Sequence, residues 1–187
     1  DVCSSDLRIN VFSQMLEPYQ PLFIEEPVLP ENVDAMAKLA RQTSIPIATG
    51  ERLFTRWGFR EVLEKQAAVI LQPDLSHAGG ILETKKIAAM AECYYGAIAP
   101  HCPLGPIALA ASIQLDACIP NFLVQEHVTT GEGLLKQPFV LEEGHIPLPT
   151  NPGLGIEIDE EALKDHLFDG TWDTPQFRHA DSSVADW

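Results

Sequence analysis

Five short apolar runs in this chain each end in a polar residue, and those polar residues recur at nearly equal spacing. They are Glu25, Glu51, Asp74, His101 and Glu126. Successive positions lie 23 to 27 residues apart, a spacing typical of one strand plus the helix that follows it. A residue that recurs once per such unit, always just after a strand, lies on one rim of a parallel sheet. The spacing therefore predicts that all five side chains face a common opening.

The local patterns predict the elements that carry this rim. Apolar runs predict strands at 22–24, 46–48, 69–71, 97–99 and 122–124, and helical spacing or capping residues predict helices at 33–40, 59–64, 81–95 and 106–115. Gly96 is placed to cap the third helix. The alternation predicts right-handed βα units and a parallel sheet. Five rim residues at one depth favour a (β/α)₈ barrel over an open doubly wound sheet, where ligands meet strand ends only around the switch point.

Composition excludes several classes of function. The 187 residues carry a formal charge of −15, which argues against nucleic acid and anionic membrane surfaces as partners, because binding to phosphate needs basic patches. No apolar stretch approaches the roughly 18 residues of a membrane span, and no signal peptide is recognisable. The four cysteines lack metal-ligand spacing. We therefore expect a cytoplasmic protein with reduced thiols.

The chemistry of the five rim residues predicts a metal-assisted proton transfer. Four acids and one histidine at one opening would repel one another without a cation, and oxygen ligands of this kind suit Mg²⁺. Glu25 and Glu51 follow neighbouring strands and can share one ion. Asp74 and His101 also follow neighbouring strands and can form a dyad in which the aspartate raises the basicity of the imidazole. Glu126 could then hydrogen-bond a substrate oxygen.

Each candidate also has a structural interpretation. Asp74 alone would usually be a helix cap, and His101 alone a hydrogen-bonded buried histidine. Glu26 is better explained as a structural acid than as a ligand. His77 precedes two glycines, so a turn is at least as good an interpretation as a catalytic role. Cys102 lies beside the candidate base, but nothing near it in the sequence would activate a thiol.

The motifs FIEEP, ATGERL, QPDLSHAGGI, APHCPLGPIALAA and PGLGIEID together resemble the mandelate racemase/muconate lactonizing enzyme branch of the enolase superfamily. The likeness is strongest to the D-galactonate dehydratases of that branch and covers the chain from about residue 16 to residue 187. It implies the C-terminal portion of a (β/α)₈ barrel, without the capping domain and the first barrel strands of the family. Residues 8–150 would form the partial barrel and 151–187 a segment docking on it. The residues of this last segment leave two interpretations open, docking through Trp172, Phe177 and Trp187 or simple disorder.

The resemblance also implies roles. Glu25 and Glu51 would bind Mg²⁺, His101 would act as general base with Asp74 as its dyad partner, and Glu126 would assist at the substrate carboxylate. The substrate would be a sugar acid that loses its β-hydroxyl after removal of the proton α to its carboxylate, giving a 2-keto-3-deoxy acid. A homo-oligomer is expected for the full-length protein.

One part of the family pattern is missing from the sequence. The family's third metal ligand, and the histidine that protonates the leaving hydroxyl, would fall at or before residue 1. Residues 1–7, DVCSSDL, resemble no part of the family and are expected to be foreign to it. The chain alone is therefore expected to be inactive, with an open sheet edge at 22–24.

Three other functions stay open on the sequence. The first is another aldonate or aldarate dehydratase, or a racemase, of the same superfamily. The second is a non-catalytic barrel fragment whose rim acids are merely solvated. The third, a dinucleotide-binding protein, is disfavoured because the glycines of 153–159 lack the preceding strand and following helix that such a site requires.

Overall fold

The structure is a computed structural model that describes residues 2–171, 173 and 176–185, with side chains described from residue 9 onward. Four short parallel strands form one sheet in the order β1-β2-β3-β4. They are β1 (Ile24–Glu25), β2 (Ile47–Thr49), β3 (Ile70–Leu71) and β4 (Ala97–Ile98). Strands that are neighbours in the sheet are also successive in the chain, as in a barrel wall built from βα units.

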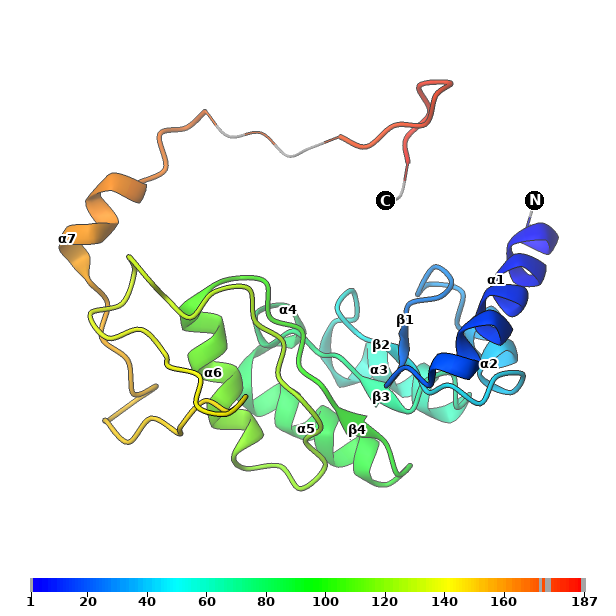
Figure 1. The fold of residues 1–187 in the computed structure, drawn as a ribbon, viewed down its shortest axis with the longest axis horizontal. Coiled ribbons are helices and arrows are strands. Elements are labelled where there is room, and N and C mark those ends of the chain that lie inside the picture. The colour runs from blue at the N-terminus through cyan, green and yellow to red at the C-terminus, as the bar shows by residue number, and fades with distance from the viewer. Residues whose placement is uncertain (1, 172, 174–175, 186–187) are drawn as a thin grey trace.

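Helices connect the strands and pack side by side in chain order, α2 on α3, α3 on α5 and α5 on α6 (Figure 1). The α-helices are α1 (Val2–Leu16), α2 (Val33–Ala40), α3 (Thr55–Glu64), α4 (Leu75–Ala78), α5 (Gly80–Glu92), α6 (Pro106–Asp116) and α7 (Glu160–Leu163). Two short 3-10 helices are η1 (Glu17–Tyr19) and η2 (Lys164–His166). Residues 2–7, expected to be foreign to the family, form the first part of α1.

Both faces of the sheet are apolar, because successive side chains of each strand point to opposite faces and both sets are largely apolar. Ile47, Leu71 and Ile98 pack into the large core shared with the helices. The residues next to them in sequence contribute to a second, smaller cluster on the other face, which includes Ala48 and Ile70. Successive side chains of a strand point to opposite faces, so runs with no polar residue are what a sheet covered on both faces requires.

Two predicted helix limits are wrong. Helix α3 begins at Thr55 rather than at residue 59, and α5 ends at Glu92 rather than at residue 95. The left-handed residue that follows α5 is Tyr95, with φ 59°. Tyr95, and not Gly96, therefore takes the left-handed position that ends the helix. The N–H of Gly96 donates to the Ala91 carbonyl at 2.8 Å. Tyr95 is 98% exposed, so its bulky side chain meets no obstacle in this conformation.

The predicted fifth strand is only partly formed. The segment 122–124 joins the sheet through a single parallel bridge between Ile98 and Phe122. The Ile98 amide donates to Asn121 O and the Leu123 amide donates to Ile98 O, both at 2.8 Å. The Asn121 side-chain amide holds the segment in place by donating to Ala88 O and Gly96 O. The side chains of 122–124 remain 38–42% exposed, with no further strand beside them among the described residues.

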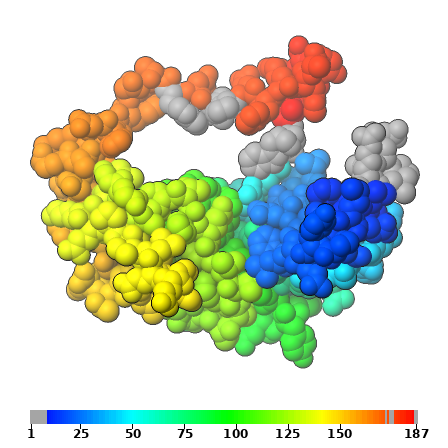
Figure 2. Space-filling view, viewed as in Figure 1, coloured from blue at the N-terminus to red at the C-terminus, as the bar shows by residue number. Residues whose placement is uncertain are grey.

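The part after residue 130 consists of loops, short pairings and the two short helices α7 and η2. Leu135 and Ile158 form an antiparallel bridge, as do Glu142 and His145. The described residues after η2, which are 167–171, 173 and 176–185, extend away from the sheet and its helices (Figures 1 and 2). Phe177 is 55% exposed, whereas Trp172 and Trp187 lie outside the described residues, so docking of this segment stays a prediction. None of the described helices combines the length and apolar character of a membrane span.

Candidate active site

The predicted rim is present at the carboxyl ends of the strands. Glu25 is the last residue of β1, Glu51 follows β2 by two residues, and Asp74 and His101 each follow their strands by three. Because the strands are parallel and adjacent, these ends lie at one edge of the sheet. The structure joins three of the residues in direct contact, namely Glu51, Asp74 and His101.

His101 lies between two carboxylates. Its Nδ1 is 3.0 Å from Asp74 Oδ2, and its Nε2 is 3.0 Å from Glu51 Oε2. The His101 side chain is 12% exposed and that of Asp74 only 1%. An imidazole held on both nitrogens has a fixed ring orientation, which is the geometry that a positioned base needs.

Asp74 has two functions, each carried by a different oxygen. Its Oδ1 accepts hydrogen bonds from the Ser76 and His77 amides, at 2.7 and 3.3 Å, and so caps the N-terminus of α4. Its Oδ2 faces His101. The cap and the dyad were alternatives on the sequence, but the structure contains both. The cap fixes the carboxylate that orients the imidazole.

Asp74 and His101 shift each other's pKa toward their charged forms. Burial lowers the pKa of the His101 imidazole, but the hydrogen bond with Asp74 and the charges of Glu51 and Glu126 outweigh it, so the pKa lies above its usual value. Burial raises the pKa of Asp74, but its hydrogen bonds with His101 and the Ser76 amide bring the net pKa below the usual value. Both shifts favour an ion pair, which a buried aspartate beside an imidazolium is expected to form.

Glu126 reaches the same region from the last segment of the rim. Its Oε2 accepts a hydrogen bond from the Cys102 amide at 2.9 Å, so the carboxylate is tied to the residue next to His101. Burial raises the pKa of the Cys102 thiol to about 11. The thiol is therefore protonated at neutral pH, which agrees with the expectation that Cys102 is not a nucleophile.

A cavity of about 610 Å³ opens at this rim. It is lined by Glu31, Glu51, Arg52, Phe54, His77, His101 and Pro103. Sequence reasoning did not single out Glu31, Arg52 and Phe54. Arg52 Nη2 lies 2.7 Å from Glu31 Oε1, and the position of Arg52 directly after Glu51 is the one sequence signal that could have identified this pair. His77 lies on α4, with its ring close to Phe54 and its Nδ1 3.4 Å from Glu51 O.

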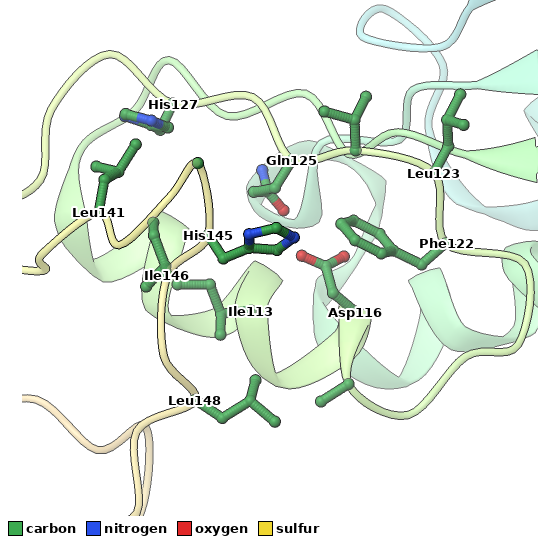
Figure 3. Close-up of a pocket in the computed structure, with 13 residues that line it drawn as sticks. Ile113, Asp116, Phe122, Leu123, Gln125, His127, Leu141, His145, Ile146 and Leu148 are labelled. Carbon is green, nitrogen blue, oxygen red and sulfur yellow. The ribbon is translucent and has the colours of Figure 1, made fainter.

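A second cavity, of about 430 Å³, lies between α6 and the loops that follow (Figure 3). Asp116 and His145 point toward each other across it, and none of the five rim residues lines it. Burial raises the pKa of Asp116 to about 8. No sequence pattern predicted this cavity, because its wall is completed by the irregular segment 141–148.

The sequence match decides the family. The model of the enolase C-terminal domain-like family matches residues 8–162. The chain belongs to this family. The match confirms the fold class predicted from the motifs, and it starts at the residue after DVCSSDL.

Several members of the enolase C-terminal domain-like family are similar over most of this chain. A curated D-galactonate dehydratase of Ralstonia nicotianae is 52% identical over 189 residues, which cover 95% of this chain and 50% of the relative. A D-galactonate dehydratase of Variovorax paradoxus is 50% identical over 183 residues, covering 92% of this chain and 48% of the relative. The chain therefore spans about half the length of the curated relatives that it matches.

Solved structures agree with the sequence match. A mandelate racemase/muconate lactonizing enzyme from Sulfitobacter sp. superposes with a TM-score of 0.84 at 46% identity, over 89% of this chain and 43% of the other. A member of the enolase superfamily from Salmonella Typhimurium gives 0.78 at 35% identity, over 83% and 41%.

The rim carboxylates supply only part of a binding site for the magnesium ion that the family implies. Among the described residues, no side chain forms a hydrogen bond or an ion pair with the Glu25 carboxylate, which is exposed at the end of β1. Glu51, after the neighbouring strand, contributes a second oxygen donor. No group of three possible ligands converges within the described part of the chain. Two oxygen donors suit Mg²⁺, which retains several waters in proteins, and the resemblance places the third ligand at or before residue 1.

Proposed function

We propose that the protein containing this chain is a Mg²⁺-dependent hydro-lyase that removes water from D-galactonate and produces 2-keto-3-deoxy-galactonate. The observation that carries the proposal is the position of His101, between Asp74 and Glu51 at the mouth of the rim cavity. The relatives named D-galactonate dehydratases, 52% and 50% identical, support the choice of reaction and substrate.

His101 would remove the proton α to the substrate carboxylate through Nε2. Because Nδ1 is engaged by Asp74, Nε2 is the nitrogen that would accept the proton. The buried Asp74 carboxylate stabilises the imidazolium that forms when Nε2 accepts the proton. Glu51 faces the same nitrogen, so the pair must separate before Nε2 can meet a substrate.

Glu25 and Glu51 would hold Mg²⁺, which supplies positive charge to stabilise the anion formed when the α proton leaves. Glu126 would hydrogen-bond the carboxylate end of the substrate from its place beside His101. Loss of the β-hydroxyl as water requires one proton. The resemblance assigns that proton to a histidine at or before residue 1, outside the described residues.

The test is an assay of the full-length gene product that contains this chain, with Mg²⁺ and a panel of aldonates and aldarates. We expect the 2-keto-3-deoxy acid to form from D-galactonate much faster than from its epimers. Preference for another sugar acid would support the proposed reaction but identify a different substrate. Epimerisation without loss of water would identify a racemase, and a protein that binds Mg²⁺ but transforms none of the acids would support a non-catalytic barrel.

Three further expectations belong to the proposal. The partner is a small sugar acid rather than nucleic acid or membrane, in keeping with the charge of −15. The full-length protein is proposed to be a homo-oligomer. Cys93, Cys102 and Cys118 are free thiols, which fits a reducing compartment, and we propose the cytoplasm.

A further inference from the structure

Glu26, the second acid of the FIEEP motif, has an uncommon backbone conformation. Its φ is 40°, in the left-handed region that residues other than glycine seldom adopt. Such a conformation costs free energy and persists only where surrounding contacts hold it. The contacts of Glu26 therefore indicate what the conformation achieves.

Among the described residues, the hydrogen bonds of Glu26 are formed with the last residues of β2. Its amide donates to Ala48 O at 3.0 Å. Its Oε1 accepts a hydrogen bond from the Thr49 hydroxyl at 2.8 Å. Burial raises the pKa of the Glu26 carboxylate overall, although the neighbouring Gly50 amide lowers it. Thr49 is completely buried. Glu26 thus forms hydrogen bonds with Ala48 and Thr49, shortly before Glu51 in the chain.

The other side of the same turn is held by β3. The Gln72 amide donates to Thr49 O at 2.9 Å, and a Cβ on Gly50 would lie 2.7 Å from the Gln72 backbone. The turn that presents Glu51 is therefore fixed between Glu26 on one side and Gln72 on the other. Glu51 leaves this turn with its carboxylate 3.0 Å from His101.

We propose that Glu26 is a positioning residue for the active site, and that its carboxylate holds the Thr49–Gly50 turn so that Glu51 is presented correctly to Mg²⁺ and to His101. The inference rests on the proposed function. It explains why two adjacent acids stand at the end of β1: among the described residues Glu25 has no side-chain partner, while Glu26 hydrogen-bonds back to β2. Groups that orient a metal ligand typically change metal affinity or activity by about 10- to 100-fold when they are removed.

The test is a double-mutant cycle in the full-length gene product, with Mg²⁺ affinity from calorimetry and kcat on the preferred sugar acid as separate measurements. Glu26→Ala and Thr49→Val should each weaken Mg²⁺ binding by about tenfold or more. The double variant should be no worse than either single variant, because both remove one interaction. Glu26→Gln and Thr49→Ser keep the hydrogen bond and should restore most of the affinity.

Glu64→Gln serves as the matched control, since it removes a negative charge from the exposed end of α3 and should leave Mg²⁺ affinity unchanged. Losses that multiply in the double variant, or Mg²⁺ affinity unchanged in folded Glu26→Ala protein, would overturn the inference. The Mg²⁺ measurement needs no turnover. A wild-type protein that binds Mg²⁺ but dehydrates no acid would therefore contradict the proposed function, while the cycle would still decide the role of Glu26.

Discussion

Asp74 Oδ2 lies 3.0 Å from His101 Nδ1, although 27 residues separate the two in sequence. The second oxygen of the same carboxylate caps α4 through the Ser76 amide. The dyad is therefore built into the junction between β3 and α4, and the imidazole orientation depends on a helix cap. This linkage allows the structural and chemical roles of Asp74 to be separated by experiment.

Asp74→Asn should separate the two roles. The amide oxygen can still cap α4, but the neutral side chain cannot stabilise an imidazolium, so we expect kcat to fall by about 10²- to 10⁴-fold with little change in thermal midpoint. Asp159→Asn is the matched control, because Asp159 caps α7 through the Glu161 and Ala162 amides and, among the described residues, forms no hydrogen bond or ion pair with a histidine. Equal kcat losses in the two variants would contradict the assignment.

His101→Asn should abolish turnover and leave Mg²⁺ binding close to that of the wild type. Asparagine can still hydrogen-bond Asp74, but it cannot accept the α proton. His166→Asn, on the exposed helix η2, controls for the substitution itself. If calorimetry showed that Mg²⁺ binding was lost together with turnover in His101→Asn, then His101 would be a ligand rather than a base.

The strand positions were predictable to within a residue or two, because strands that are buried on both faces consist of nearly continuous apolar residues. The runs at 46–48 and 69–71 became β2 and β3. Placing rim residues one βα unit apart was also enough to predict that Asp74 and His101 would meet. These features follow from the regular geometry of parallel sheets.

The remaining features depend on contacts that the local sequence does not encode. The pairing of Glu51 with His101 depends on where the turn at Gly50 directs the Glu51 carboxylate. Helix α3 starts at Thr55, whose φ of 56° the apolar spacing of the sequence does not predict. The segment 122–124 has a strand sequence but pairs only with β4, because no described strand lies on its other side.

Gly50→Ala should disturb the site through the backbone. The substitution forces a methyl group to within 2.7 Å of Gln72, at a φ of 153°, so we expect a loss of about 1–3 kcal/mol in unfolding free energy. Urea titration measures it. Gly58→Ala is the control, because Gly58 lies within α3 and its added Cβ would meet only ordinary contacts at 3.6 Å and beyond. That variant should be more stable by about 0.5–1 kcal/mol, and a loss equal to that of Gly50→Ala would contradict the interpretation.

Asp116 should make stability depend on pH. Burial raises its pKa to about 8 in the folded chain, against about 3.9 in an unfolded one. Between these values the folded state retains a proton that the unfolded state has lost, so the stability present at pH 4 falls as pH rises toward 8. Asp116→Asn removes this titration.

The check is the difference in unfolding free energy between Asp116→Asn and wild type, from urea titrations between pH 4 and pH 9. The difference should increasingly favour the variant as pH rises and should level off above about pH 8, the folded-state pKa of Asp116. A flat profile for Asp116→Asn would show that Asp116 is not buried in its neutral form.

The most direct test of the central claim is a proton NMR time course of D-galactonate in D₂O, with Mg²⁺ and the full-length gene product that contains this chain. Removal of the α proton followed by loss of the β-hydroxyl predicts that the C-2 proton signal disappears at the rate at which 2-keto-3-deoxy-galactonate appears, with one solvent deuterium at C-3. Exchange of the C-2 proton without this product would show proton abstraction without dehydration. A C-2 signal that persists in the presence of folded, Mg²⁺-bound protein would contradict the account.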